Sequence, residues 1–165
     1  MELFETQGSE TRLENSRVRV IHNNDKPDLP RIRFTIWVKW SNRLEIANIG
    51  APGVYLLAQL PIAPDGDANP QEKEIIYVGE TCDRSLRTRW NEFHRCAFEG
   101  KSGHSGGTTY WNIFGGQHVE RLFVAALPVS TLSEPVRSSF IRFVEREVLL
   151  DYALKWGVLP KCNSK

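Results

Sequence analysis

Segments 53–58 and 74–78 are short apolar runs, and in the residues that follow apolar side chains recur at every third or fourth position. Both segments are β-branched and aromatic runs, and the proline-rich loop between them predicts a long-looped β-hairpin. After the hairpin, Leu86, Trp90 and Phe93 are spaced as on one face of a helix. The change of pattern favours folds in which a hairpin leads directly into an amphipathic helix.

A further strand is predicted at residues 31–40, where polar and apolar side chains alternate. The residues predicted to face the core are Ile32, Phe34, Ile36, Val38 and Trp40. The residues predicted to face outward are Arg31, Arg33, Thr35, Trp37 and Lys39. The outward row offers cations for phosphates and an aromatic ring for stacking. The alternative is a solvated strand face on which the tryptophan is covered by the N-terminal arm.

Three further elements complete the predicted fold. We expect a short helix at 108–114, a buried strand at 121–127, and a long helix within 133–157 that begins at a capping serine and a proline and ends at a glycine. This order predicts an α+β fold with a small, mostly antiparallel β-sheet flanked by helices. We expect one domain, in which an N-terminal arm and extra strand (1–50) join a core of residues 51–165.

Composition limits the classes of protein to which the chain can belong. Its 165 residues are 41% hydrophobic and 25% charged, which fits one globular core and excludes a coiled coil or a disordered chain. The three cysteines contain no close pair, which argues against a disulfide scaffold and a zinc site. The net charge of +1 does not by itself indicate a nucleic-acid partner. Without a signal peptide or a long apolar run, the chain is expected to be a soluble cytoplasmic protein with no membrane partner.

Five short pieces of sequence occur in an order that resembles the GIY-YIG nuclease superfamily. They are Gly53-Val54-Tyr55 with Tyr77-Val78-Gly79, then Glu80-Thr81, Ser85-Leu86-Arg87-Thr88-Arg89-Trp90, Glu145, and Pro160-Lys161-Cys162-Asn163. The superfamily includes homing endonucleases, some restriction endonucleases and a nuclease subunit of excision repair. The resemblance covers residues 53–163 and is greatest to the stand-alone restriction endonucleases.

The resemblance implies a site that hydrolyses phosphodiester bonds. This reaction needs an activated water, a cation that neutralises charge on phosphorus, and help for the departing oxygen. By resemblance, Glu145 would hold one divalent cation per site, Mg²⁺ or Mn²⁺. Arg89 would clamp the scissile phosphate, and Tyr55 would activate or position the attacking water. Tyr77 would join the same cluster, and Asn163 would brace the site from the C-terminal end.

Helix phase bears on the choice between Arg87 and Arg89 as the phosphate clamp. Arg89 follows the apolar Leu86 by three residues and precedes the apolar Trp90 by one, as the arginine does in the family. The spacing from Tyr77 is longer than is typical, so Arg87 remains the alternative clamp and is otherwise expected to contact DNA.

The last predicted helix offers two candidate metal ligands, Glu145 and Glu147. Glu145 lies in a row with Ile141 and Leu149, where an unpaired carboxylate would be costly. Glu147 has Asp151 four residues later, a like-charged neighbour that suits water better. We therefore expect Glu145 to be the ligand.

Histidines and a helper for the tyrosine are less well defined by the sequence. The family histidine lies four residues past the arginine, where this chain has Phe93, and His94 follows one position later as the catalytic candidate. His104, in a glycine-rich loop, is a second candidate. A neutral tyrosine is a poor base, and Lys73 is a candidate to lower the pKa of the catalytic tyrosine.

The expected function is that of a metal-dependent DNA endonuclease, and more specifically a sequence-specific type II restriction enzyme. The more specific expectation rests on a length beyond that of a bare nuclease module, without a separate DNA-binding domain. The alternatives are a structure-specific repair or mobile-element nuclease, and a catalytically inactive DNA- or protein-binding module. The expected partner is double-stranded DNA, contacted by Arg31, Arg33, Lys39 and Arg87. A palindromic site would require a homodimer on DNA.

Overall fold

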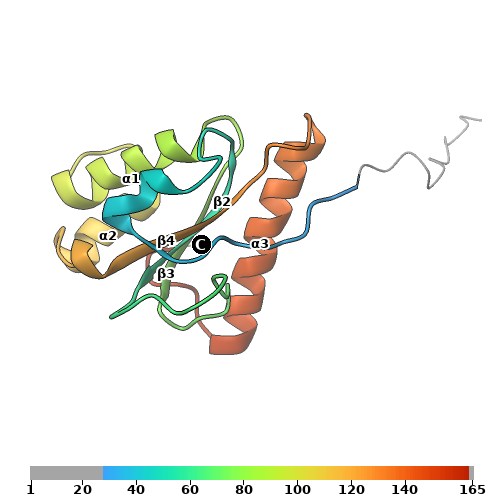
Figure 1. The fold of residues 1–165 in the computed structure, drawn as a ribbon. Helices are drawn as coiled ribbons and strands as arrows, with labels where there is room; N and C mark the ends of the chain where they lie inside the picture. Colours follow the sequence, from blue (N-terminus) through green and yellow to red (C-terminus); the bar gives the residue numbers. More distant parts are fainter. Residues whose placement is uncertain (1–27, 164–165) are drawn as a thin grey trace, which may run out of the picture.

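The computed structural model describes residues 28–163, which form a four-stranded antiparallel sheet and three α-helices (Figure 1). The strands are β1 (Val38–Lys39), β2 (Gly53–Gln59), β3 (Ile75–Thr81) and β4 (Leu122–Pro128), in the order β1-β4-β2-β3 across the sheet. The helices are α1 (Leu86–Glu99), α2 (Ser105–Phe114) and α3 (Val136–Trp156), with 3₁₀ turns η2 (Trp40–Glu45) and η3 (Val119–Arg121). The predicted α+β class with a small antiparallel sheet is confirmed.

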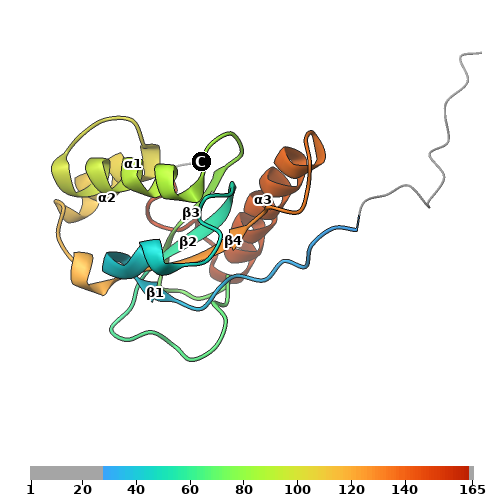
Figure 2. The ribbon, with the colours of Figure 1, turned by 45° about the horizontal axis from the view of Figure 1, so that its top comes forward.

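Helices cover both faces of the sheet, so the fold has three layers (Figure 2). Val54 and Leu56 of β2 point into a core shared with α3. Tyr55 and Leu57 point into a second core, shared with α1, α2 and η2, because successive side chains of a strand face opposite sides. Strand β3 is at the edge of the sheet, so side chains from both layers can meet along it.

The predicted hairpin is confirmed as β2 and β3. The two strands pair antiparallel, with Tyr55 opposite Gly79 and Leu57 opposite Tyr77. The register shifts just beyond Leu57, and such irregularities re-aim the side chains of the strand that carries them. Because directly opposed residues share a face and alternate residues of a strand do too, Tyr77 and Gly79 lie on the same face of the sheet as Tyr55.

The predicted strand at 31–40 is wrong for most of its length. Only Val38–Lys39 form a strand, β1, which pairs with β4. Trp37, predicted to face outward, is 4% exposed and packs in the α3-side core. Ile32 and Ile36, predicted to face the core, are both exposed, Ile36 to 55%. Phe34 is buried as predicted.

Hydrogen bonds of Thr35 explain why the alternation fails. Its backbone N–H donates to the Ala126 carbonyl at 2.8 Å, and the Ala126 N–H donates to its side-chain hydroxyl at 3.0 Å. The Thr35 carbonyl accepts the N–H of Ala68, from the loop before β3, at 3.0 Å. A side chain thus takes the place of a backbone acceptor, which is the local competition typical of threonine, and no regular ladder extends through this segment.

The predicted helices are present with shifted ends. α2 begins at Ser105, three residues before its predicted start, because the side chain of His104 caps it. α3 ends at Gly157, as predicted, where φ is 72°. Its first residue is Val136, and the predicted capping residue Ser133 makes no side-chain cap.

Two further findings concern the sequence-based expectations. No helix in the described part of the chain has both the length and the apolar character needed to cross a membrane. The three cysteines are all buried and unpaired. The first part of the predicted domain (1–50) includes residues 1–27, which lie outside the described residues.

Candidate active site

The side chains of Tyr55, on β2, and Tyr77, on the edge strand β3, pack together beside Gly79. The rings of Tyr55 and Tyr77 are 5.9 Å apart between centroids. A Cβ atom on Gly79 would lie 2.5 Å from the Tyr77 ring and 2.6 Å from the Tyr55 ring, far inside contact distance. A Cβ atom on Gly106 of α2 would likewise lie 2.4 Å from the Tyr77 ring. Both glycines are therefore needed for this packing of the tyrosines.

A buried histidine binds the first tyrosine. His104 is 1% exposed, and its Nε2 is 2.8 Å from the hydroxyl of Tyr55. Its Nδ1 accepts the backbone N–H of Gly107 at 3.1 Å, which caps α2. A neutral imidazole carries one proton, so the acceptor role of Nδ1 leaves that proton on Nε2. His104 therefore donates to the oxygen of Tyr55.

The protonation states of these three groups follow from burial and from one cation. Burial raises the pKa of Tyr55 well above its ordinary value, Tyr77 raises it further, and the charge of Arg89 opposes both. Burial also raises the pKa of Tyr77, again opposed by Arg89. Burial lowers the pKa of His104 to about 3, and Arg89 adds to that shift. At neutral pH the cluster consists of two phenols, a neutral imidazole and a guanidinium.

Arg89 is the arginine that reaches the tyrosines. It is the fourth residue of α1, between the buried Leu86 and Trp90, and its side chain is partly buried. It forms an ion pair with Glu92 at 3.1 Å. Arg87 is exposed on the same helix. The geometry thus favours Arg89 over Arg87 as the group beside the tyrosines, in agreement with helix phase.

Glu145 approaches the edge strand from α3, on the other side of the sheet. Its side chain is 13% exposed and is 3.2 Å from the exposed Arg146. Burial raises its pKa, Arg146 opposes this, and Glu80 of β3 adds to the increase. Glu80 lies between Val78 and Cys82, both of which pack in the α3-side core, so the alternation of the strand turns Glu80 toward α3 as well.

The expected difference in exposure between the two glutamates of α3 is not observed. Glu147 is also partly buried, and its Oε2 has no hydrogen-bond partner among residues 28–163. Glu145 differs from Glu147 in its neighbours. The charge of Glu145 raises the pKa of Tyr77, and the charge of Glu80 raises the pKa of Glu145.

The carboxylates present fit a hard divalent cation of the kind that the resemblance implies. A divalent cation held by Glu145 and Glu80 would favour the charged form of both carboxylates. Burial by itself favours the protonated form of Glu145, because it raises the pKa of that group. Within residues 28–163 no group of three or more His, Cys, Asp or Glu residues could hold a metal. Mg²⁺ commonly binds through one or two carboxylates and keeps several waters, whereas zinc sites use three or four protein ligands.

A polar pocket of about 170 Å³ lies beside these groups, with Glu80, Arg89 and Arg142 in its wall. The thiol of Cys82 donates to a carboxylate oxygen of Glu80 at 3.2 Å and holds it at the pocket. The carboxylates in its wall are Glu80 and Asp83, Glu145 not being among the lining residues, and the guanidinium groups of Arg84, Arg89 and Arg142 suit a phosphate.

Asn163 occupies the outer edge of β3 next to the tyrosines. Its side-chain amide donates to the Val78 carbonyl, and its side-chain oxygen accepts the Val78 N–H, both at 2.8 Å. The N–H of Cys162 donates to the Ile76 carbonyl at 2.7 Å. The C-terminal segment thus satisfies backbone groups of the edge strand and fixes the strand that carries Tyr77.

Two sequence-based candidates lie elsewhere. His94 faces η2, where its Nδ1 accepts the indole N–H of Trp40 at 3.1 Å. Lys73, the candidate helper, precedes β3 at the opposite end from Gly79, and its ammonium lies 5.5 Å from the ring centre of Trp156. His104 occupies the position beside Tyr55 that the sequence could not assign.

The expected DNA-contacting residues of the segment 31–40 do not form one strand face. Arg33 is exposed and pairs with Asp67, while Arg31 and Lys39 are also exposed. A shared face would require a regular strand over residues 31–40, and the structure has a strand only at Val38–Lys39.

Sequence reasoning missed Glu80. The predicted strand ends at Val78, whereas β3 continues to Thr81, and alternation along the longer strand places Glu80 on the same face as Val78. Comparison with protein-family models, with curated proteins and with solved structures found no match to this chain.

Proposed function

We propose that the chain is a metal-dependent DNA endonuclease. The observation that carries the proposal is the convergence of four side chains from four elements on one edge strand: Tyr55 of β2, Tyr77 of β3, Arg89 of α1 and Glu145 of α3. A cation, a carboxylate and hydroxyl groups in one place are what hydrolysis of a phosphodiester bond requires.

Arg89 would bind the scissile phosphate. In the present arrangement it pairs with Glu92, and Tyr55 beneath it is fully buried. A phosphate dianion or diester can replace a carboxylate partner of arginine, because both accept its forked N–H groups. The proposal therefore requires Arg89 to exchange Glu92 for phosphate and to uncover the hydroxyl of Tyr55.

Tyr55 would position the attacking water. As a neutral phenol it can accept one hydrogen bond and donate another. The acceptor role is already taken by the N–H of His104, at 2.8 Å. Its own proton would then orient a water at the site as a hydrogen-bond donor, without taking a proton from that water.

Glu145, with Glu80 opposite, would hold the divalent cation. When bound, such a cation supplies Lewis-acid stabilisation of charge on the phosphate and on the departing oxygen. Glu145 and Glu80 belong to the α3 side of β3, and Arg89 to the side of α1. The phosphate would then be held from both faces of the edge strand, which limits its orientation.

The more specific proposal is a restriction endonuclease that acts as a homodimer on a palindromic site, in the cytoplasm. It is tested by incubating the full chain and Mg²⁺ with plasmid DNA, with branched duplexes and with flapped duplexes. Discrete plasmid fragments support restriction, and cuts confined to junctions or flaps support a repair or mobile-element nuclease. If no substrate is cut with Mg²⁺ or Mn²⁺, the chain is an inactive binding module and the proposal fails.

A further inference from the structure

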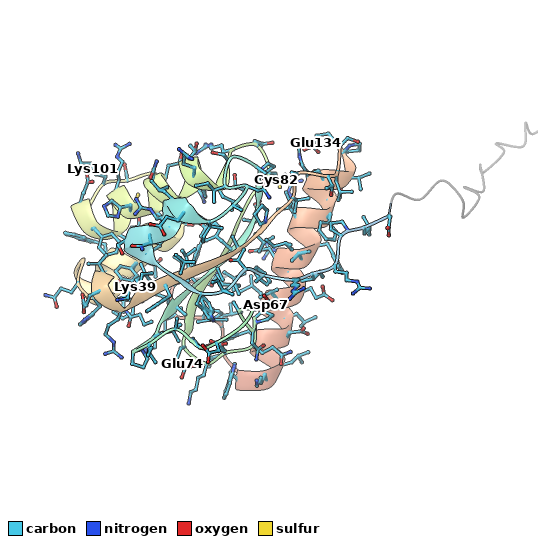
Figure 3. All side chains as sticks on the ribbon, viewed as in Figure 1. Lys39, Asp67, Glu74, Cys82, Lys101 and Glu134 are labelled. Carbon is cyan, nitrogen blue, oxygen red and sulfur yellow. The ribbon has the colours of Figure 1, made fainter. Side chains whose placement is uncertain are left out.

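A second pocket, of about 390 Å³, lies at the start of β3. Its wall contains three cations, Lys73, Arg121 and Lys161, together with the aromatic ring of Trp156. Glu74, which also lines it, marks the end of β3 opposite Cys82 (Figure 3). The pocket is therefore separate from the one beside Arg89.

The tryptophan organises the cations around it. Its indole N–H donates to the Gln71 carbonyl at 3.1 Å, which fixes the ring. The ammonium groups of Lys73 and Lys155 lie 5.5 and 5.1 Å from the ring centre, within the range of a cation–π interaction. Lys155 also donates to the Gln71 carbonyl, at 3.2 Å. Two lysine ammonium groups thus lie near one ring, that of Lys73 from the wall of the pocket and that of Lys155 from outside it.

Three cations and one carboxylate, that of Glu74, line the pocket, so its wall carries a net positive charge. Within residues 28–163, no carboxylate forms an ion pair with Lys73, Arg121, Lys155 or Lys161. Around the active-site pocket, by contrast, Arg84 and Arg89 share Glu92. Unpaired like charges gathered at one place repel each other, and an anion would remove that cost.

The pocket and the active site lie along the same strand. Ile75 lines the pocket and Gly79 separates the two tyrosines, and four residues of strand span about 13 Å. A duplex that lies along this strand could therefore place backbone phosphates at both positions. Lys161 and Asn163 lie on the same C-terminal segment, which connects the two places along the outer edge of β3.

We propose that this basic pocket binds a backbone phosphate of the DNA whose scissile phosphate lies at Arg89. The inference rests on the proposed function and adds a second anchor for the DNA, about 13 Å along the strand from Gly79. A DNA phosphate is favoured over an acidic protein partner as the ligand, because the pocket lies along the same strand as the proposed site for the scissile phosphate. The edge strand cannot itself pair with a partner strand at Ile76 and Val78, whose backbone groups the C-terminal segment already occupies.

The test measures binding of a short fluorescent duplex to the full-length Glu145→Gln protein over a range of salt concentrations. The Lys73→Ala/Lys155→Ala double variant is expected to lower the slope of log affinity against log salt by about 0.9 for each phosphate that the variant no longer binds. The matched control is Arg95→Ala/Lys101→Ala, which also removes two positive charges. Both residues are exposed near the C-terminal end of α1, and this control is expected to leave the slope unchanged. Lys161→Gln gives a second variant that leaves the packing around Trp156 intact.

An unchanged slope in the folded pocket variants, or an equal decrease in the control, overturns the inference even if the wild-type chain cuts DNA. A decrease confined to the pocket variants in a chain that cuts no DNA supports the pocket and removes the nuclease proposal. If the duplex is displaced as well by polyglutamate or by a mononucleotide as by unlabelled duplex, the ligand is not a DNA strand. Absence of any duplex binding overturns the inference as well.

Discussion

Replacing His104 with asparagine separates the two hydrogen bonds that the buried imidazole makes. Asparagine is a preferred N-cap and can still accept the Gly107 N–H, so α2 keeps its cap. Its shorter side chain does not reach the hydroxyl of Tyr55, which stays buried and has no partner in its place. A buried polar group left without a partner costs about 1–3 kcal/mol. We therefore expect His104→Asn to unfold more easily by this amount at pH 7.5.

The size of this difference depends on pH, because burial lowers the pKa of His104 to about 3. Between that value and the ordinary value of about 6.5, the unfolded chain binds a proton at this histidine and the folded chain does not. Folding stability therefore decreases as the pH falls through 6.5, by about 1.4 kcal/mol per pH unit. By pH 4.5 the wild type is less stable by about 2–3 kcal/mol through this group, whereas His104→Asn is not affected in this way.

Urea unfolding followed by tryptophan fluorescence at several pH values measures both effects. The advantage of the wild type over His104→Asn should shrink toward pH 4.5 and disappear or reverse there. His118→Asn is the control, because His118 is exposed and should leave the pH dependence as it is. A constant gap between wild type and His104→Asn from pH 7.5 to 4.5 would refute the neutral, buried histidine from which the direction of the Tyr55 hydrogen bond is derived.

Three further substitutions test other parts of the site. Arg89→Ala is expected to slow single-turnover cleavage by at least about a hundredfold, whereas Arg87→Ala mainly weakens DNA binding, and equal rate reductions would contradict the assignment from helix phase. Gly79→Ala places a Cβ 2.5 Å from a tyrosine ring and should lower the free energy of unfolding by about 1–3 kcal/mol, measured in urea. Asn163→Ala removes both hydrogen bonds to Val78 and should lower stability by about 1–3 kcal/mol and slow cleavage, and no change in either would remove its bracing role.

Most of the fold could be predicted from local patterns. The hairpin strands and the strand at 122–128 are short apolar runs bounded by turn residues, and the helix after the hairpin has a clear period of 3.6. The segment 31–40 could not be predicted correctly, because its pattern alternates while its conformation is set by distant partners. Thr35 binds Ala126, 91 residues away, with its side chain. No local pattern contains that contact.

The candidate site could be predicted only as far as strand alternation and helix phase extend. Helix phase alone favours Arg89 over Arg87. The role of His104 could not be predicted, because a glycine-rich loop gives no periodic signal and the 2.8 Å contact to Tyr55 joins residues 49 positions apart. Burial of Glu147 also depends on how the chain packs against α3, which the sequence of the helix does not specify.

Single-turnover cleavage of duplex DNA by Glu145→Gln, compared with Glu147→Gln and the wild type, tests the proposed endonuclease most directly. Glutamine keeps the shape and hydrogen bonding of the side chain but lacks the charge that would hold the cation. We expect Glu145→Gln to bind duplex DNA and to cut it at least about a thousandfold more slowly with Mg²⁺, while Glu147→Gln keeps its activity. Cleavage by Glu145→Gln at the wild-type rate would contradict the proposed active site.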